Sequence, residues 1–233
     1  MSANNQSAQG GDNHINLYEP HVWKHHTKVA GLEWKNPVGT ASGTFQYAAV
    51  RWFYDVSQLG AVCTKGASPV PWEGNPSPRT AESPAANINA VGLQNPGIDH
   101  YLAEDLPKLK AAGAFVISNV AGHCDDDYAA VVEKLADSDA DMLEINVSCP
   151  NVKEGAIAFG QKADALYNIT SEIKKKAKQP IIMKLSPNVT DITEMARAAE
   201  AAGSDALSLI NTLTGMKIDI HRRKFVLANK TGG

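Results

Sequence analysis

The chain has 233 residues, is 43% hydrophobic and carries a net charge of −3, so it can enclose a sizeable core. This charge provides no basic surface for nucleic acid, and no apolar run approaches the ~18–20 residues that cross a bilayer. The three cysteines lie far apart without a C-x-x-C pair. They predict neither a disulfide framework nor a metal site, and we expect a cytoplasmic protein.

The first 27 residues predict a flexible N-terminal tail. They contain neither the apolar stretch of a signal peptide nor the Arg-rich amphipathic pattern of a transit peptide. We expect residues 28–233 to form one catalytic domain that begins with a hairpin at Lys28–Trp34.

Short apolar segments alternate with longer helical segments along the rest of the chain. Six segments are apolar on both faces and end in polar turns, as buried parallel strands do. They are Val38–Ser42, Ala61–Lys65, Ala114–Asn119, Asp141–Val147, Pro180–Leu185 and Asp205–Asn211. The predicted helices between them are Ala48–Gln58, Ile98–Ala112, Asp126–Ala136, Gln161–Lys178 and Ile192–Ala202.

This alternation predicts an α/β fold, either a (β/α)8 TIM barrel or a doubly wound sheet. No predicted strand is followed by G-x-G-x-x-G at the start of a helix, which disfavours a dinucleotide-binding Rossmann fold. We therefore favour the TIM barrel. A closed barrel has eight strands in roughly 250 residues, so the chain is expected to cover about six of the eight β/α units.

Polar residues collect where these predicted strands end. In a barrel the carboxyl ends of all strands meet on one face, where barrel enzymes have their active sites. Any single lysine or cysteine there could be a solvated or simply buried side chain, but six such ends together indicate a site. The residues are Ala41-Ser42-Gly43-Thr44, Thr64-Lys65-Gly66, Ser118-Asn119, Asn146 with Cys149, Lys184 and Asn211-Thr212.

Two lysines and several amides, without a His, Asp or Glu at those ends, predict a pocket for an anionic, carbonyl-rich ring rather than a hydrolase. Amides both donate and accept hydrogen bonds, and lysines can neutralise a flavin or a carboxylate. The thiol of Cys149 can act as a general base near neutral pH once it is activated. A Schiff-base aldolase using Lys65 or Lys184, and an inactive barrel fragment, remain alternatives.

The segment Asn146-Val-Ser-Cys-Pro-Asn151 resembles the N-x-S-C-P-N segment of the soluble, class 1 dihydroorotate dehydrogenases. Further segments resemble that family in the same order, from about Lys28 to the end, and the combination is highly specific. Two of these segments, Ile210–Met216 and Ala228–Gly233, resemble the NAD-linked subclass, class 1B. These further segments are Asn36–Gly43, Gly74–Arg79, Ile88–Gly97, Ile210–Met216 and Ala228–Gly233.

The resemblance implies an FMN enzyme that oxidises (S)-dihydroorotate to orotate in pyrimidine synthesis. It implies that Cys149 removes the C5 proton while the C6 hydride passes to flavin N5. Carried over by motif, the substrate residues are Lys65, Asn89, Val91, Gly92, Leu93, Asn146, Asn151, Asn211 and Thr212. The FMN residues are Ala41, Ser42, Gly43, Lys65, Gly66, Asn119, Asn146, Lys184 and Ile210. A pyrimidine-reducing flavoenzyme domain is a nearby alternative, but Asn151 and Asn211-Thr212 favour dihydroorotate.

The resemblance also implies partners. The NAD-linked form works with a second subunit that carries FAD and an iron–sulfur cluster, and we expect a homodimer at the core of a heterotetramer. Three cysteines cannot supply the four thiolates of a typical cluster, in agreement with a cluster on another chain. The membrane-bound class has Ser in place of the catalytic Cys and an apolar N-terminal extension, and this chain has neither.

The chain departs from the family pattern at its end. Family members continue past Thr231-Gly-Gly233 into two more strands, whose loops hold the FMN phosphate as in other barrels. We therefore expect the 233 residues to be a fragment or a cleaved form of a longer chain, with weak FMN binding and little activity.

Overall fold

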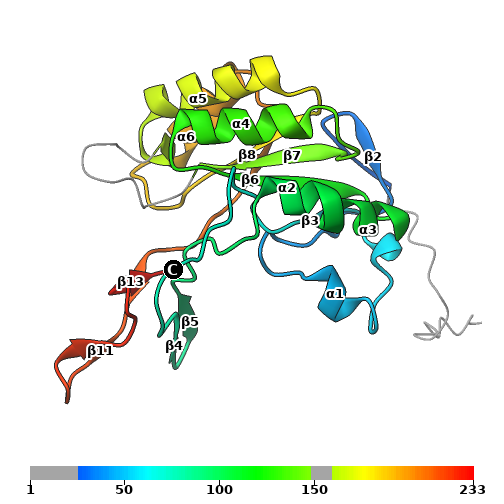
Figure 1. Cartoon of the computed structure of the whole chain (residues 1–233). Helices are drawn as coiled ribbons and strands as arrows, with labels where there is room; N and C mark the ends of the chain where they lie inside the picture. The colour runs from blue at the N-terminus through cyan, green and yellow to red at the C-terminus, as the bar shows by residue number, and fades with distance from the viewer. Residues whose placement is uncertain (1–25, 148–158) are drawn as a thin grey trace, which may run out of the picture.

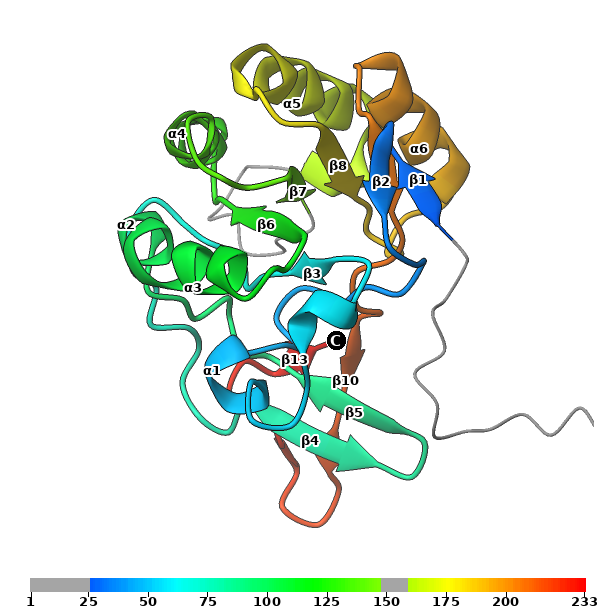
Figure 2. The ribbon, with the colours of Figure 1, turned by 90° about the vertical axis from the view of Figure 1, so that its right-hand side faces the viewer.

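The computed structural model describes residues 26–147 and 159–233. Its centre is a curled parallel sheet of five strands in the order β3, β6, β7, β8, β9 (Figures 1 and 2). Within this sheet, each strand lies beside the one that follows it in chain order. The strands are Val62–Cys63, Val116–Ala121, Met142–Asn146, Ile181–Lys184 and Ala206–Ser208. This sequential order of parallel strands is that of a (β/α)8 barrel, and the predicted fold class is confirmed.

Helices cover the outer face of this sheet (Figure 2). The chain passes through α2 Ile98–His100, a π-helical turn η2 at Tyr101–Asp105 and α3 Leu106–Ala111, so the predicted helix 98–112 exists but is interrupted. The remaining helices agree closely with the predicted ones: α4 Asp125–Leu135, α5 Ala163–Lys176 and α6 Ile192–Ala201.

Alternation along the strands separates two environments. Leu143 and Ile145 of β7 point outward and pack with the helices in the main core cluster. Met142 points inward and belongs to a smaller cluster with Ile117 and Ile182, against which Trp34 packs. Because side chains alternate with a period of two, Glu144 and Asn146 share the inward face of β7 with Met142. The interior is therefore apolar at its amino end and polar at its carboxyl end.

The predicted N-terminal hairpin is present as β1 Thr27–Val29 and β2 Leu32–Trp34, paired antiparallel. Most of the predicted N-terminal tail, residues 1–25, lies outside the described residues. In the part of the chain that the structure describes, no helix combines the length and apolar character needed to cross a membrane.

The segment before β3 differs from the prediction. In place of the strand Val38–Ser42 there is one isolated parallel bridge, between Gly39 and Ala61, which still sets a sixth chain segment beside β3. In place of the helix 48–58 there is a short helix α1, Tyr47–Val50, and a 3₁₀ turn η1, Val56–Gln58. The side chain of Asp55 accepts a hydrogen bond from Ser57 N, which starts the new turn and ends helical continuity.

A small antiparallel lobe, which the sequence patterns do not predict, lies away from the helices (Figure 1). Its first hairpin is β4 Thr80–Ser83 with β5 Ala86–Asn89. The C-terminal segment adds β10 Gly215–Met216 paired with β13 Thr231–Gly232, and β11 Ile218–Asp219 paired with β12 Lys224–Phe225. The first hairpin and the C-terminal segment are joined by two backbone hydrogen bonds between Asn89 and Gly233, with N···O distances of 2.9 and 2.8 Å.

Candidate active site

A cavity of about 560 Å³ lies between the carboxyl ends of the strands and the antiparallel lobe. Every described residue that the resemblance assigns to substrate or FMN lines it: Ala41, Ser42, Gly43, Lys65, Gly66, Asn89, Val91, Gly92, Leu93, Asn119, Asn146, Lys184, Ile210, Asn211 and Thr212. Two other strand-end residues that the sequence pattern pointed to do not line it: Thr64 lines a neighbouring hollow, and Ser118 is buried against Tyr101. Cys149 and Asn151 lie outside the described residues. The fold thus brings residues from the segment 41–43, from the carboxyl-terminal parts of the five strands and from a separate hairpin to one place.

A second hollow, of about 1000 Å³, lies alongside and shares Gly43, Lys65, Gly66 and Val91 with the first. Its other walls come largely from α1, from α3 and from the loop around Trp72. The strand-end amides Asn119, Asn146 and Asn211 line only the smaller cavity, so we take the smaller cavity as the candidate site.

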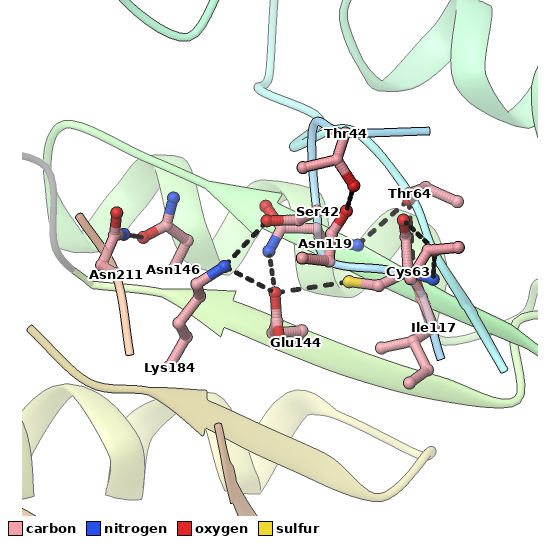
Figure 3. Close-up of polar contacts among 12 residues, drawn as sticks. Ser42, Thr44, Cys63, Thr64, Ile117, Asn119, Glu144, Asn146, Lys184 and Asn211 are labelled. Atoms are coloured by element: carbon pink, nitrogen blue, oxygen red, sulfur yellow. Dashed lines mark hydrogen bonds and ion pairs between the residues drawn. The ribbon is translucent and has the colours of Figure 1, made fainter. Parts of the chain in front are cut away.

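A buried carboxylate, Glu144, lies at the polar end of the barrel interior (Figure 3). Its Oε1 accepts hydrogen bonds from Asn119 Nδ2 at 2.6 Å and from Cys63 Sγ at 3.3 Å. The ammonium of Lys184 lies 3.6 Å from the same oxygen. Glu144 lies inside β7 rather than at its end. The expectation that the strand ends carry no His, Asp or Glu is wrong for β6, because His123 follows that strand by two residues and lines the cavity. Glu144 lies only two residues before Asn146, and a charged residue at an inward position of an apolar strand was the available signal.

Cys63 donates to this carboxylate as a neutral thiol. Burial, and after it the negative charge of Glu144, raise the pKa of Cys63 well above its usual range. The thiol therefore keeps its proton, and Cys63 is a hydrogen-bond donor here rather than a nucleophile.

Lys184 connects opposite parts of the curled sheet. Its Nζ donates to Ser42 Oγ at 3.0 Å, although Ser42 ends the first predicted strand and Lys184 ends β8. The contact reaches across the interior, as Figure 3 shows. The residue is only 9% exposed, so its positive charge lies largely out of bulk water, next to Glu144.

Asn119 presents an unsatisfied acceptor. Its Nδ2 donates to Glu144, and its Oδ1 is buried without a hydrogen-bond partner among the described residues. A Cβ added at Gly66 would lie 2.6 Å from that Oδ1, so only glycine fits beside this oxygen. Buried polar atoms are normally paired, and this oxygen therefore fits a ligand that supplies an N–H donor.

The amides at the ends of β7 and β9 are held by hydrogen bonds. Asn211 Nδ2 donates to Asn146 Oδ1 at 2.9 Å, and the buried Tyr128 hydroxyl donates to the Asn146 carbonyl at 2.7 Å. Asn188, which the sequence analysis missed, donates from Nδ2 to the Thr212 carbonyl and accepts from Thr214 N, both at 3.0 Å. Asn188 thus fixes the loop that carries Asn211 and Thr212.

The backbone that carries Val91, Gly92 and Leu93 is fixed by Asn75. Asn75 N donates to Val91 O, and Asn75 Nδ2 donates to Ala90 O, both at 3.0 Å. Gly92 has φ of 76°, and a Cβ there would lie 2.6 Å from Asn75 N. This turn therefore requires glycine, both for its conformation and for the close approach of Asn75.

The geometry defines an α/β-barrel protein with a polar, lysine- and amide-lined pocket at the carboxyl ends of its strands. The family model for dihydroorotate dehydrogenase matches residues 24–233, and the chain belongs to that family. The predicted enzyme class, an oxidoreductase acting on dihydroorotate, is confirmed with it.

Three similar proteins are named as the catalytic subunit of dihydroorotate dehydrogenase B (NAD(+)). The protein from Lachnoclostridium phytofermentans is 59% identical over 209 residues, which cover 88% of this chain and 69% of the relative. The one from Alkaliphilus metalliredigens is 53% identical, covering 88% and 68%. The one from Enterococcus faecalis is 49% identical over 211 residues, covering 88% and 67%. The resemblance to the NAD-linked subclass is thereby confirmed.

Proposed function

We propose that this chain carries out the FMN-dependent oxidation of (S)-dihydroorotate to orotate, with Cys149 as the base and an electron-transfer subunit as the route to NAD. The main support is the cavity at the strand ends, which gathers every predicted FMN and orotate residue in the described part of the chain. The named relatives, whose printed name includes NAD(+), support the same activity.

The residues present fit a flavin. A flavin ring carries an N–H donor, and the buried Oδ1 of Asn119 is an acceptor without a partner among the described residues. Gly66 packs against that oxygen without the clash that a Cβ would cause, and Lys65 and Lys184 supply cations along the same cavity. FMN, when bound, supplies the acceptor for the hydride from C6 of the substrate. The chain's own residues would hold the ring and balance the charge that develops on it.

The substrate would be held by amides and one cation. Asn146 and Asn211, already hydrogen-bonded to each other, can pair with the imide and urea edges of a dihydropyrimidine ring. Thr212 and the backbone around Gly92 border the same space, and Lys65 suits the substrate carboxylate. Such contacts would hold the ring in a fixed orientation between the proposed base and the cofactor.

Cys149 follows β7 by three residues, in a segment outside those described. As the proposed base, its thiolate Sγ takes the proton from C5 of dihydroorotate, which is acidic because it lies next to a carbonyl. The C5–H electron pair then forms the new ring double bond while the C6 hydride leaves. The thiol must lose its proton again before the next turnover.

Electrons would leave through a second subunit carrying FAD and an iron–sulfur cluster, with this chain as a homodimer core in the cytoplasm. The support is the relatives' printed name, which calls them catalytic subunits and includes NAD(+). We further propose that residues 28–233 belong to the catalytic barrel domain and that the tail predicted for residues 1–27 ends before Thr27, which already begins β1.

The test is cofactor content of the complete gene product. We expect a yellow protein with close to one FMN per chain, whose visible absorbance is bleached by dihydroorotate without oxygen. A colourless protein in which borohydride traps a carbonyl substrate on Lys65 or Lys184 would instead support the aldolase alternative. A colourless protein with neither reaction would support a barrel without catalytic activity.

A further inference from the structure

Glu144 has no place in the proposed function, although three side chains of the polar interior contact its carboxylate (Figure 3). It is 6% exposed, and one of its oxygens faces Asn119, Cys63 and Lys184 together. Acidic side chains are rarely so buried unless they are paired, because removing a charge from water is costly. A buried carboxylate next to the candidate cofactor residues therefore suggests a function for Glu144.

We propose that Glu144 is a positioning residue that orients Asn119 and Lys184 toward the cofactor and whose negative charge sets the redox potential of bound FMN. This inference rests on the proposed function, because it concerns the same cavity. Glu144 does not line that cavity itself and would act through its two partners.

The first part of the role is the direction of the Asn119 amide. An ionised carboxylate only accepts hydrogen bonds, so the NH₂ group of Asn119 turns toward Glu144 Oε1, at 2.6 Å. The carbonyl Oδ1 must then face the other way, beside Gly66 in the cavity. Without the acceptor at Glu144, the Asn119 amide could flip and turn its NH₂ group toward the flavin N–H. Two donors would then face each other and repel.

The second part is electrostatic. The ammonium of Lys184 lies 3.6 Å from Glu144 Oε1 and also donates to Ser42. A cation beside a flavin favours its electron-rich, reduced form, and a buried carboxylate behind that cation offsets the effect. Since Cys63 stays a neutral thiol, it adds a hydrogen bond to this pair without adding a charge.

The test compares Glu144→Gln with the parent protein, both loaded with FMN. Glutamine keeps the size of the side chain but removes the charge, so Lys184 is no longer offset. We expect the potential of bound FMN to rise, corresponding to at least a tenfold change in the ratio of affinities for reduced and oxidised FMN. For a two-electron couple that is about 30 mV.

The matched control is Asp141→Asn. Asp141 immediately precedes β7, roughly 10 Å along the strand from Glu144. It is also ion-paired to a lysine, with Lys110 Nζ at 2.6 Å, and it accepts from Val116 N at the amino end of the sheet. The same charge change just before the same strand, away from the cavity, should leave the FMN potential unchanged.

Glu144→Asp separates orientation from charge. It keeps the negative charge but shortens the reach to Asn119, so FMN should bind at least tenfold more weakly while its potential stays near that of the parent. An unshifted potential in Glu144→Gln, or equal shifts in the Gln and Asp variants, would overturn the inference. If Glu144→Gln does not fold, unchanged FMN affinity in Glu144→Asp would overturn it. A parent protein that binds no FMN would overturn the proposed function itself.

Discussion

Asn211 and Asn146, 65 positions apart in the chain, are joined side chain to side chain by a hydrogen bond of 2.9 Å. The bond ties the segment after β9 to the end of β7, inside the candidate substrate pocket. The direction of both amides is fixed, because Asn211 Oδ1 accepts from Thr212 N at 2.8 Å, which leaves Asn211 Nδ2 to donate to Asn146 Oδ1. The pair therefore presents a preset edge to a ligand.

We predict that Asn211→Ala weakens orotate binding at least tenfold, because it removes one amide and releases the other. Quenching of the bound flavin or calorimetry would measure the dissociation constant. Asn168→Ala is the matched control, since Asn168 is an exposed residue on α5. Equal affinity in the Asn211 variant and the parent would remove Asn211 from the substrate site.

We predict that Gly66→Ala loses at least tenfold in FMN affinity. The added Cβ would lie 2.6 Å from Asn119 Oδ1, which Glu144 holds in place through the other end of the amide. The backbone at Gly66 is not in the left-handed region, so the expected loss comes from space rather than from strain. Gly215→Ala is the control, because its Cβ would meet only Ile88 Cδ1 at an ordinary 3.7 Å. Normal FMN content in Gly66→Ala would contradict the proposed cofactor site.

We predict that Cys149→Ala lowers turnover by ~10²–10⁴-fold while orotate still binds, since loss of a general base typically has this effect. Cys149→Ser should recover part of the activity as pH rises, because a hydroxyl is the poorer base. Cys124→Ala is the control, since Cys124 is an exposed cysteine. Turnover like that of the parent in Cys149→Ala would rule out this base.

We predict that Lys65→Ala slows reduction of the flavin by dihydroorotate in a stopped-flow experiment. Its ammonium should stabilise the negative charge that develops on the ring and the substrate carboxylate. Lys178→Ala is the control, because Lys178 forms a surface ion pair with Asp137. If both variants reduce flavin at the parent rate, Lys65 is only a polar wall of the cavity.

The barrel and the position of the site could be predicted because both depend on local patterns. Apolar runs such as Met142–Asn146 identify buried strands, and the order of strands then fixes where their ends meet. The antiparallel lobe could not be predicted in this way. Its pairing joins Asn89 to Gly233 across 144 positions, through short, partly exposed strands whose composition resembles loops.

Two site residues were missed for different reasons. Glu144 sits inside a strand rather than after it, so a search of strand ends passed over it, although the strand's alternation places it beside Asn146 on the inward face. Asn188 acts on the backbone of Thr212 and Thr214, a loop conformation that only the folded chain reveals. Contacts between side chains of separate segments depend on the tertiary structure, which local sequence patterns do not give.

The route of the electrons gives a last prediction. The sequence has no G-x-G-x-x-G after a strand and too few cysteines for a typical cluster, so a nicotinamide site is not evident in it. We predict that the complete gene product alone reduces artificial dyes with dihydroorotate but does not reduce NAD. Adding an FAD and iron–sulfur subunit should confer NAD reduction, because the partner would accept electrons from FMN.

The assay follows NADH formation with and without that subunit, with fumarate as a competing acceptor. Cys149→Ala serves as the control for both acceptors, since without the base no electrons should enter FMN at a useful rate. Efficient fumarate reduction by the isolated chain would place it with the fumarate-linked enzymes despite its similarity to the NAD-linked relatives. Efficient NAD reduction by the isolated chain would show that the nicotinamide binds here, and the two-subunit route would then be wrong.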